Sequence, residues 1–126
     1  MIQQLRIRSE KPEDYPEIKR INDEAFGQKQ EGILIEKLRL EPAYIRDLSL
    51  VALLNGKMVG HILFFPVNIV NGERSKATLS LAPLAVDPKY QNQGIGIQLV
   101  ERGLQRAKAA GFSSVVVVGH PGYYPR

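Results

Sequence analysis

One stretch decides the fold of this chain, because the end of a strand, a turn and the start of a helix follow one another in it. It reads Leu84-Ala85-Val86-Asp87-Pro88-Lys89-Tyr90-Gln91-Asn92-Gln93-Gly94-Ile95-Gly96. The apolar residues up to Val86 end the strand, and the two glycines open the helix. Glycine lets a ligand approach the backbone closely, and the unpaired amides and the dipole of a helix N-terminus attract an anion. The stretch therefore predicts a turn that binds pyrophosphate.

Two other phosphate-binding motifs do not fit this stretch. The Walker A motif needs Gly-Lys-Ser/Thr, which occurs nowhere in the chain. The dinucleotide-binding motif needs a third glycine three residues after Gly96, where the chain has Leu99. A nucleotide-hydrolysing or dinucleotide-binding domain is therefore not indicated.

The pattern of apolar residues predicts the elements around this stretch. We expect strands over 2–8, 48–54, 58–67, 78–86 and 113–118, and helices from Pro12 to Phe26, over 31–40 and over 94–110. The second helix should turn Leu34 and Leu38 to one face, and the third should turn Ile97, Val100, Leu104 and Ala107 inward. Asn-Gly turns at 55–56 and 71–72 predict antiparallel hairpins, while the helix before the last strand predicts a parallel pair. The fold class is therefore α/β, a mixed sheet flanked by helices in the order β-α-α-β-β-β-α-β.

Length and composition limit the classes of protein that the chain can belong to. The 126 residues suit one domain, over 1–126, with 44% hydrophobic and 24% charged residues, as in globular proteins. No apolar run is long enough to span a membrane, and the start shows no apolar signal region. Cysteine is absent, which fits a reducing compartment, so we expect a cytoplasmic protein.

The net charge of +4 comes entirely from the C-terminal half. Residues 1–63 contain 10 basic and 10 acidic side chains, and residues 64–126 contain 7 basic and 3 acidic ones. This distribution suits a ligand that carries phosphate. It lacks the tight basic cluster of a nucleic-acid surface, so we expect neither a nucleic acid nor a membrane as partner.

Two motifs together resemble the GNAT superfamily of N-acetyltransferases. Gln91-x-x-Gly94-x-Gly96 is similar to the acyl-coenzyme-A signature of that family, Arg/Gln-x-x-Gly-x-Gly/Ala, and Tyr123-Tyr124-Pro125-Arg126 is similar to the start of its second motif. The order of the predicted elements agrees as well. The resemblance implies the acyl-CoA N-acyltransferase fold, with acetyl-coenzyme A as cosubstrate and no metal.

The resemblance also implies which residues contact the cosubstrate. The implied residues are Leu84, Ala85, Val86, Gln91, Asn92, Gln93, Gly94, Ile95, Gly96 and Ile97. In this family the pantetheine arm pairs with the first three through their backbone, at a place where the strand diverges from its neighbour. Pro83 is compatible with such an interruption, because proline cannot donate to a central strand. The amides of 92–97 would hold the pyrophosphate.

Catalytic residues follow from the same resemblance. Tyr124 matches the tyrosine of the family, and a phenol with a pKa of about 10 can protonate a leaving thiolate. Tyr123 is the adjacent alternative. His120 follows the last strand and is our candidate base, with a hydrogen-bonded histidine at the strand end or a chain of waters as alternatives. His61 lies inside a strand, where we expect a structural role.

The chain departs from the family pattern at two places. Gly119-His120-Pro121-Gly122 stands where many members have Asn-x-x-Ala, so the contact of that asparagine is not carried over. The family pattern also continues with two further strands, which are absent from this chain. Four consecutive valines at 115–118 suit a strand buried on both faces. We therefore expect the chain to be a fragment, or another chain to supply the missing strands.

The sequence thus predicts an N-acyltransferase that moves an acetyl group from acetyl-coenzyme A to a primary amine. The amine, of a small molecule or a peptide, attacks the thioester directly. The alternative is a non-catalytic module that binds or senses acyl-coenzyme A, and a homodimer is left open. Mutation of Tyr124 separates the two functions, because an enzyme loses turnover but keeps its affinity for the cosubstrate.

Overall fold

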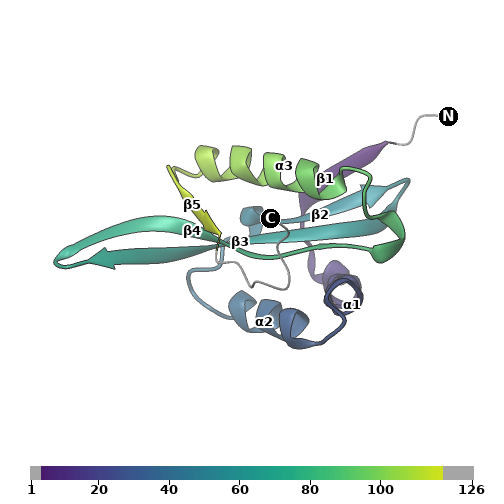
Figure 1. Cartoon of the computed structure of the whole chain (residues 1–126), viewed down its shortest axis with the longest axis horizontal. Coiled ribbons are helices and arrows are strands. Elements are labelled where there is room, and N and C mark those ends of the chain that lie inside the picture. Colours follow the sequence, from purple (N-terminus) through teal and green to yellow (C-terminus); the bar gives the residue numbers. More distant parts are fainter. Residues whose placement is uncertain (1–3, 118–126) are drawn as a thin grey trace.

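The computed structural model describes residues 4–117, and its elements follow the predicted order (Figure 1). The strands are β1 (Leu5–Ser9), β2 (Ser49–Leu54), β3 (Lys57–Asn71), β4 (Arg74–Val86) and β5 (Val115–Val117), and the helices are α1 (Tyr15–Phe26), α2 (Gln30–Arg39) and α3 (Ile95–Ala109). Short 3-10 helices cover Pro12–Asp14, Arg46–Leu48 and Pro88–Tyr90. The predicted order β-α-α-β-β-β-α-β is confirmed.

The five strands form one mixed sheet in the order β1-β2-β3-β4-β5. The first three pairs are antiparallel, and β4 and β5 are parallel, with Leu79 opposite Val115. Helix α3 covers one face of the sheet, and α1 and α2 cover the other (Figure 1). The mixed α/β architecture predicted from the hairpin turns and the crossover helix is therefore confirmed.

Each face of the sheet carries its own core. On the α3 side, Leu50, Ile62, Phe64, Leu79 and Leu99 are fully buried. A second cluster joins α1 and α2 to the sheet and contains Ile18, Ile21, Ile35, Val51 and Leu63. Alternate residues of the central strands thus enter opposite cores, which fixes their register.

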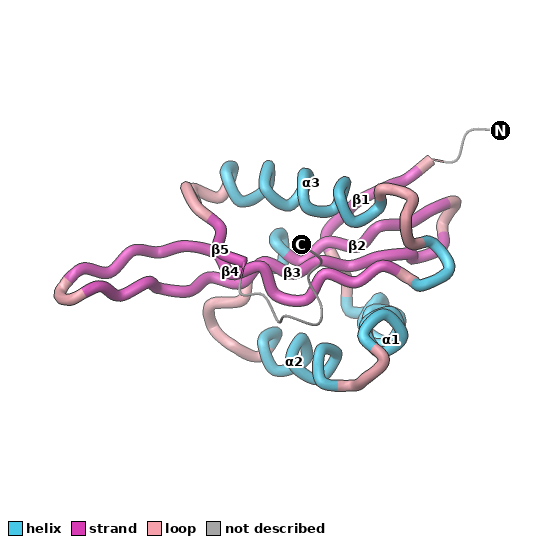
Figure 2. Tube along the Cα trace, viewed as in Figure 1, coloured by secondary structure: helices cyan, strands magenta, loops and turns pink. Residues whose placement is uncertain are grey.

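The hairpin of β3 and β4 is longer than predicted. The two strands pair from Gly60 with Val86 out to Asn71 with Arg74, and their outer half extends beyond the helices as a two-stranded arm (Figure 2). Residues 68–77 of this arm are exposed. The predicted second hairpin is confirmed, but its turn lies at 72–73, one residue later than predicted, and Gly72 has a positive φ of 64°. The prediction ended the first strand too early, at Val67, and began the second too late, at Thr78, because exposed residues such as Asn68 and Lys76 interrupt the apolar pattern.

The predicted inward face of α3 was wrong at two positions. Ile97 and Leu104 are 68% and 45% exposed, whereas Leu99 and Gly103 are buried. The reason lies at Gly103, since an added Cβ there would lie 2.0 Å from Cε2 of Phe64. The phenyl ring packs directly on the bare backbone of the helix, and this contact sets which face of α3 turns inward.

Two smaller predictions about burial were also wrong. In α2, Leu34 is 42% exposed and the neighbouring Ile35 is buried instead. In β5, Val117 is 58% exposed, because among residues 4–117 this strand pairs with β4 alone. The strand is therefore not buried on both faces within the described residues. No helix in the described part of the chain is long and apolar enough to cross a membrane.

Candidate functional site

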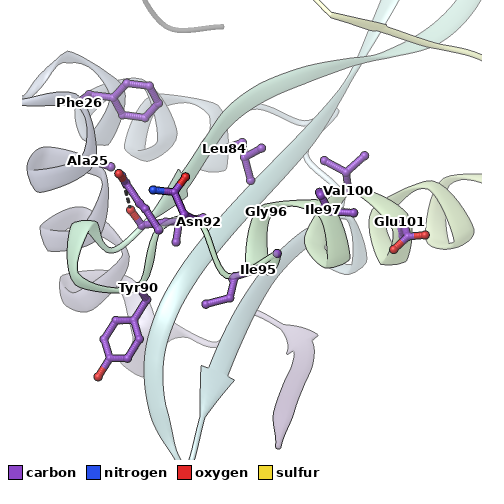
Figure 3. Close-up of a pocket in the computed structure, with 13 residues that line it drawn as sticks. Ala25, Phe26, Leu84, Tyr90, Asn92, Ile95, Gly96, Ile97, Val100 and Glu101 are labelled. Carbon is purple, nitrogen blue, oxygen red and sulfur yellow. Dashed lines mark hydrogen bonds between the residues drawn. The ribbon is translucent and has the colours of Figure 1, made fainter. Parts of the chain in front are cut away.

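A pocket of about 880 Å³ lies where β4 ends and α3 begins (Figure 3). Its lining comes from the end of α1, the end of β4, the turn after it, and the first two turns of α3. The lining residues are Ala25, Phe26, Leu84, Val86, Tyr90, Gln91, Asn92, Gly94, Ile95, Gly96, Ile97, Val100 and Glu101. The pocket thus lies at the carboxyl end of β4, where ligands of open α/β sheets bind.

The strand that leads into the pocket is interrupted. Opposite β3, Ile62 pairs with Leu84 and Phe64 with Leu81, so Ala82 and Pro83 together face Leu63. This is a β-bulge, which bends the strand locally and leaves a residue unpaired. The bulge lies on the β3 side of β4, whereas the expected divergence is from the next strand; the described pairing of β4 with β5 runs only from Leu79 to Leu81, and that divergence stays a prediction.

The turn after β4 is held by Asp87. This residue is buried, and its Oδ1 accepts a hydrogen bond from the Lys89 amide at 3.0 Å. The Asp87 amide donates to the Val59 carbonyl at 2.8 Å, and the Tyr90 amide donates to the Asp87 carbonyl at 2.8 Å. Further along, the amide group of Gln91 donates to the Val86 carbonyl at 3.3 Å. These bonds fold the chain back toward the pocket.

The N-terminus of α3 forms one wall of the pocket. Gly94 precedes the helix with a φ of 81°, and Asn92 also has a positive φ, 65°. The first helical hydrogen bond runs from the Gln98 amide to the Gly94 carbonyl at 3.1 Å. The amides of Ile95, Gly96 and Ile97 therefore have no acceptor within the helix, and together with the helix dipole they can bind an anion.

The backbone at Gly96 is open toward the pocket. An added Cβ there would meet only Val86 and Leu84 side chains, at 3.7 and 3.9 Å. Among the described residues, the pocket is lined by no lysine or arginine, and Glu101 is its one charged residue. The basic excess of the C-terminal half is therefore not concentrated in the lining, and an anion at this place would depend on backbone amides.

The pocket brings together eight of the ten residues expected to contact the cosubstrate. The eight are Leu84, Val86, Gln91, Asn92, Gly94, Ile95, Gly96 and Ile97. The side chain of Ala85 is buried with α1 and α2 on the other face of the sheet, and Gln93 is exposed outside the lining. The candidate catalytic residues His120 and Tyr124 lie outside the described residues.

Sequence reasoning missed five residues of the lining: Ala25, Phe26, Tyr90, Val100 and Glu101. Val100 and Glu101 follow Gly96 and Ile97 by one helical turn, so helix periodicity could have indicated them. Ala25 and Phe26 reach the pocket only through the packing of α1 on the sheet. Nothing in the local sequence signals that arrangement.

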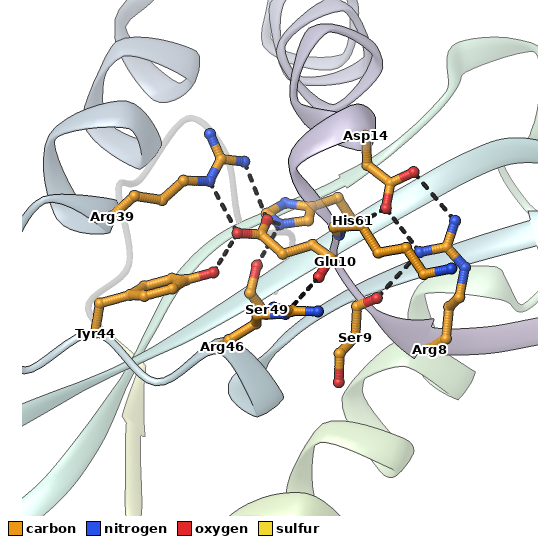
Figure 4. A network of polar contacts seen from close by, with 10 residues as sticks. Arg8, Ser9, Glu10, Asp14, Arg39, Tyr44, Arg46, Ser49 and His61 are labelled. Carbon is orange, nitrogen blue, oxygen red and sulfur yellow. Dashed lines mark hydrogen bonds and ion pairs between the residues drawn. The ribbon is translucent and has the colours of Figure 1, made fainter.

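A second polar cluster is buried between α2 and the sheet and surrounds Glu10 (Figure 4). The Glu10 carboxylate is fully buried and accepts hydrogen bonds from Arg39 at 2.9 and 3.0 Å and from the Tyr44 hydroxyl. His61 Nε2 lies 2.9 Å from Ser49 Oγ and 3.5 Å from Glu10 Oε1. The cluster ties α2 and the segment after it to the sheet, which agrees with the structural role expected for His61.

The ionisation of this cluster follows from its contacts. Burial raises the pKa of Glu10, but the hydrogen bonds from His61, Arg39 and Tyr44 outweigh it and hold that pKa below its ordinary value. Burial lowers the pKa of His61, although Glu10 opposes the shift. Burial and the Glu10 carboxylate raise the pKa of Tyr44. The cluster therefore holds a charged carboxylate and a neutral imidazole, and none of these side chains lines the pocket.

The fold and the pocket agree with the family to which the sequence points. Residues 8–122 match the Acetyltransferase (GNAT) family, so the chain belongs to it. It is 38% identical over 113 residues to the uncharacterized N-acetyltransferase YjhQ of Escherichia coli strain K12, covering 90% of this chain and 62% of YjhQ. It is 39% identical over 121 residues to the uncharacterized N-acetyltransferase YhbS of the same strain, covering 95% of this chain and 70% of YhbS. The chain thus spans about two thirds of the length of these relatives.

Solved structures of similar proteins contain the expected cosubstrate. A GNAT family acetyltransferase from Brucella melitensis, in complex with acetyl-CoA, matches with a TM-score of 0.83 and 36% identity, covering 96% of this chain and 79% of that one. The structure of YhbS from Escherichia coli, in complex with CoA, matches with a TM-score of 0.83 and 34% identity, covering 98% of this chain and 67% of that one. The acyl-CoA N-acyltransferase fold predicted from the sequence is confirmed.

Proposed function

We propose that this chain is the catalytic domain of an N-acetyltransferase that uses acetyl-coenzyme A. The observation that carries the proposal is the pocket at the N-terminus of α3. The amides of Ile95, Gly96 and Ile97 have no acceptor within the helix, and Gly94 and Gly96 have no side chains that would keep a ligand away from them. Two similar proteins hold acetyl-CoA or CoA in their solved structures, which supports the same class of ligand here.

The residues present fit such a ligand. A pyrophosphate needs several donors and close backbone approach, which the first turn of α3 supplies. A pantetheine arm needs an apolar channel with free backbone groups, and the lining by Leu84, Val86 and Phe26 beside the bulge at Ala82 and Pro83 suits it. The amides of 95–97 thus position the cosubstrate. The described pairing of β4 with β5 stops at Leu81, so on that edge the backbone of 84–86 is available to the pantetheine arm.

The proposed reaction is acetyl transfer to a primary amine of a small molecule or a peptide. The amine nitrogen, after losing a proton, attacks the thioester carbonyl, the carbon–sulfur bond breaks, and the thiolate of coenzyme A accepts a proton. In this proposal His120 accepts the proton that the ammonium loses before the attack, and Tyr124 donates a proton to the thiolate. The second proton, which the nitrogen loses as the amide forms, returns to Tyr124. An amine with a pKa of about 10 and a thiol with a pKa of about 8.5 make both transfers necessary near neutral pH.

A direct test combines binding and turnover. Calorimetry with coenzyme A should show binding, and thiol release from acetyl-coenzyme A in a panel of amines, measured on a chain extended beyond Arg126, should identify the acceptor. Tyr124→Phe should lower turnover by about two to four orders of magnitude, as loss of a general acid does, with coenzyme A affinity unchanged. Binding without turnover for any amine would favour the sensing module instead. Absence of binding would contradict the proposal.

A further inference from the structure

One ion pair joins two walls of the pocket that come from distant parts of the chain. Arg20 lies on α1, and its Nη2 is 3.3 Å from Oδ2 of Asp87, 67 residues further along. The C-terminal turn of α1 supplies Ala25 and Phe26 to the pocket, and the turn that Asp87 begins supplies Tyr90, Gln91 and Asn92. Figure 3 shows α1 on one side of the pocket and this turn next to it.

The two partners differ in exposure, so loss of the contact affects the buried Asp87 more than the exposed Arg20. The Asp87 side chain is only 3% exposed, whereas the Arg20 side chain is 38% exposed. One Asp87 oxygen accepts from the Lys89 amide and the other accepts from Arg20. A buried carboxylate that loses its cationic partner is strongly destabilised, so the ion pair keeps the turn close to α1.

Arg20 is itself held in place on α1. Its Nε and Nη2 each donate to Glu17 at 2.9 Å, and its Nη1 donates to Glu24. These carboxylates hold the guanidinium in place. It therefore loses little further conformational freedom when it binds Asp87. The side chain therefore acts as a short, rigid link between the helix and the turn.

We infer that the Arg20–Asp87 pair is a positioning device for the cosubstrate. It sets the distance between the end of α1 and the turn at 87–92, and so the width of the pocket in which coenzyme A binds. The inference rests on the proposed function. Neither side chain lines the pocket, so both act through the residues that they hold.

Two single variants test the pair from opposite sides. Arg20→Ala removes the cation, while Asp87→Asn removes the charge but keeps an oxygen for the Lys89 amide. Each should raise the Kd for coenzyme A by about fivefold to tenfold, measured by calorimetry well below the melting temperature, since the pair holds the turn against α1. The double variant should be no weaker than the worse single one, because both remove the same contact. Arg20→Lys should restore part of the affinity.

A matched control and a structural readout separate positioning from general stability. Lys19→Ala removes the neighbouring ion pair of α1, between Lys19 and Asp23, which does not reach the turn, and should keep Kd within twofold of the parent. In Arg20→Ala without ligand, the amides of residues 89–93 should exchange hydrogen faster than in the parent. If Arg20→Ala does not fold, the Kd values of Arg20→Lys and Asp87→Asn are compared with that of the parent instead.

Three outcomes would overturn the inference. Unchanged Kd in the folded variants would show that the pair only stabilises the fold. An equal effect of Lys19→Ala would show that any loss of charge on α1 suffices. Absence of coenzyme A binding by the parent chain would contradict both the proposed function and this inference. Binding by the parent chain with an unchanged Kd in the variants would contradict the inference alone.

Discussion

Gly96 lies where the backbone of α3 borders the pocket with no side chain between them. Its position is compatible with a small side chain, because an added Cβ meets only Val86 and Leu84 at ordinary contact distances. A larger residue would extend into the space expected for the pyrophosphate. Gly94 is limited differently, since its φ of 81° is strained for residues with a side chain.

We predict that Gly96→Val lowers the affinity for acetyl-coenzyme A by about two to three orders of magnitude, because several charge-assisted bonds of roughly 1.5–3 kcal/mol each are prevented. Calorimetry measures the affinity, and circular dichroism confirms that the variant folds. Gly96→Ala is the graded control and should lose less. Unchanged affinity in a folded Gly96→Val chain would refute the proposed phosphate site.

Among the elements, α3 shows which structural features the sequence pattern predicts and which it does not. The glycines and the strand before them predicted where the helix begins and what its N-terminus can bind. The inward face was misjudged because Gly103 carries no side chain and gives no apolar signal, yet Phe64 packs on it. The parts of the pocket supplied by one continuous segment could be predicted, and those supplied by α1 could not, because they depend on packing between distant segments.

The contact of Gly103 with Phe64 can be tested directly. Gly103→Ala should lower the free energy of unfolding by about 1–3 kcal/mol, since overpacking outweighs the gain of roughly 1 kcal/mol in helix propensity. Urea denaturation measures the change. Arg102→Ala, on the exposed face of α3, should stay within about 0.5 kcal/mol of the parent. Phe64→Leu should offset part of the loss when combined with Gly103→Ala, and strict additivity would contradict the proposed clash.

The Glu10 cluster joins α2 to the sheet and makes stability depend on pH. The folded-state pKa of Glu10 lies below its ordinary value, so its stabilisation is present above about pH 4.5 and is lost as the pH falls through the folded pKa. The pKa of His61 is lowered too, so the unfolded chain binds the proton first and stability falls as the pH drops below about 6.5. Both groups therefore weaken the fold in acid.

We predict that Glu10→Gln costs about 3–5 kcal/mol at pH 7, because Arg39 is then left buried without a counter-charge. The variant should also lose the share of Glu10 in the fall of stability below about pH 4.5, while Asp14, Glu17 and Asp87, whose pKa values are lowered too, keep theirs. Urea denaturation from pH 3 to 8 gives both quantities. Asp47→Asn, at a carboxylate whose side chain is 80% exposed, is the control and should follow the parent curve. An equal pH dependence in Glu10→Gln and the parent would contradict the assignment.

On the scale of the whole molecule, the edge of β5 that has no partner strand among the described residues bears on behaviour in solution. Among residues 4–117 this strand pairs with β4 alone and leaves Val117 58% exposed, and the similar proteins YjhQ and YhbS are longer than this chain. An apolar strand edge tends to associate with other chains. The role proposed for Tyr124 also requires its side chain to be held in a fixed position.

We predict that the 126-residue chain alone associates and has little or no activity, while a chain with a few tens of additional C-terminal residues is monodisperse and active. Light scattering and thiol release from acetyl-coenzyme A, compared for both lengths, measure the difference. Equal activity together with a clean monomer for the 126-residue chain would show that no further strand is needed.

The buried carboxylate at Glu10 also has a consequence for the order of folding. Its contacts with Arg39 and Tyr44 close loops of 29 and 34 residues. Closing these loops costs the chain conformational entropy, which the ion pair has to offset. A carboxylate that leaves water before the guanidinium arrives is costly, so the burial of Glu10 and the docking of α2 have to occur together. The hairpin of β2 and β3 needs only the two-residue turn at 55–56 and can form first. We therefore expect docking of α2 to be a late step of folding and substitution of Glu10 to change its rate.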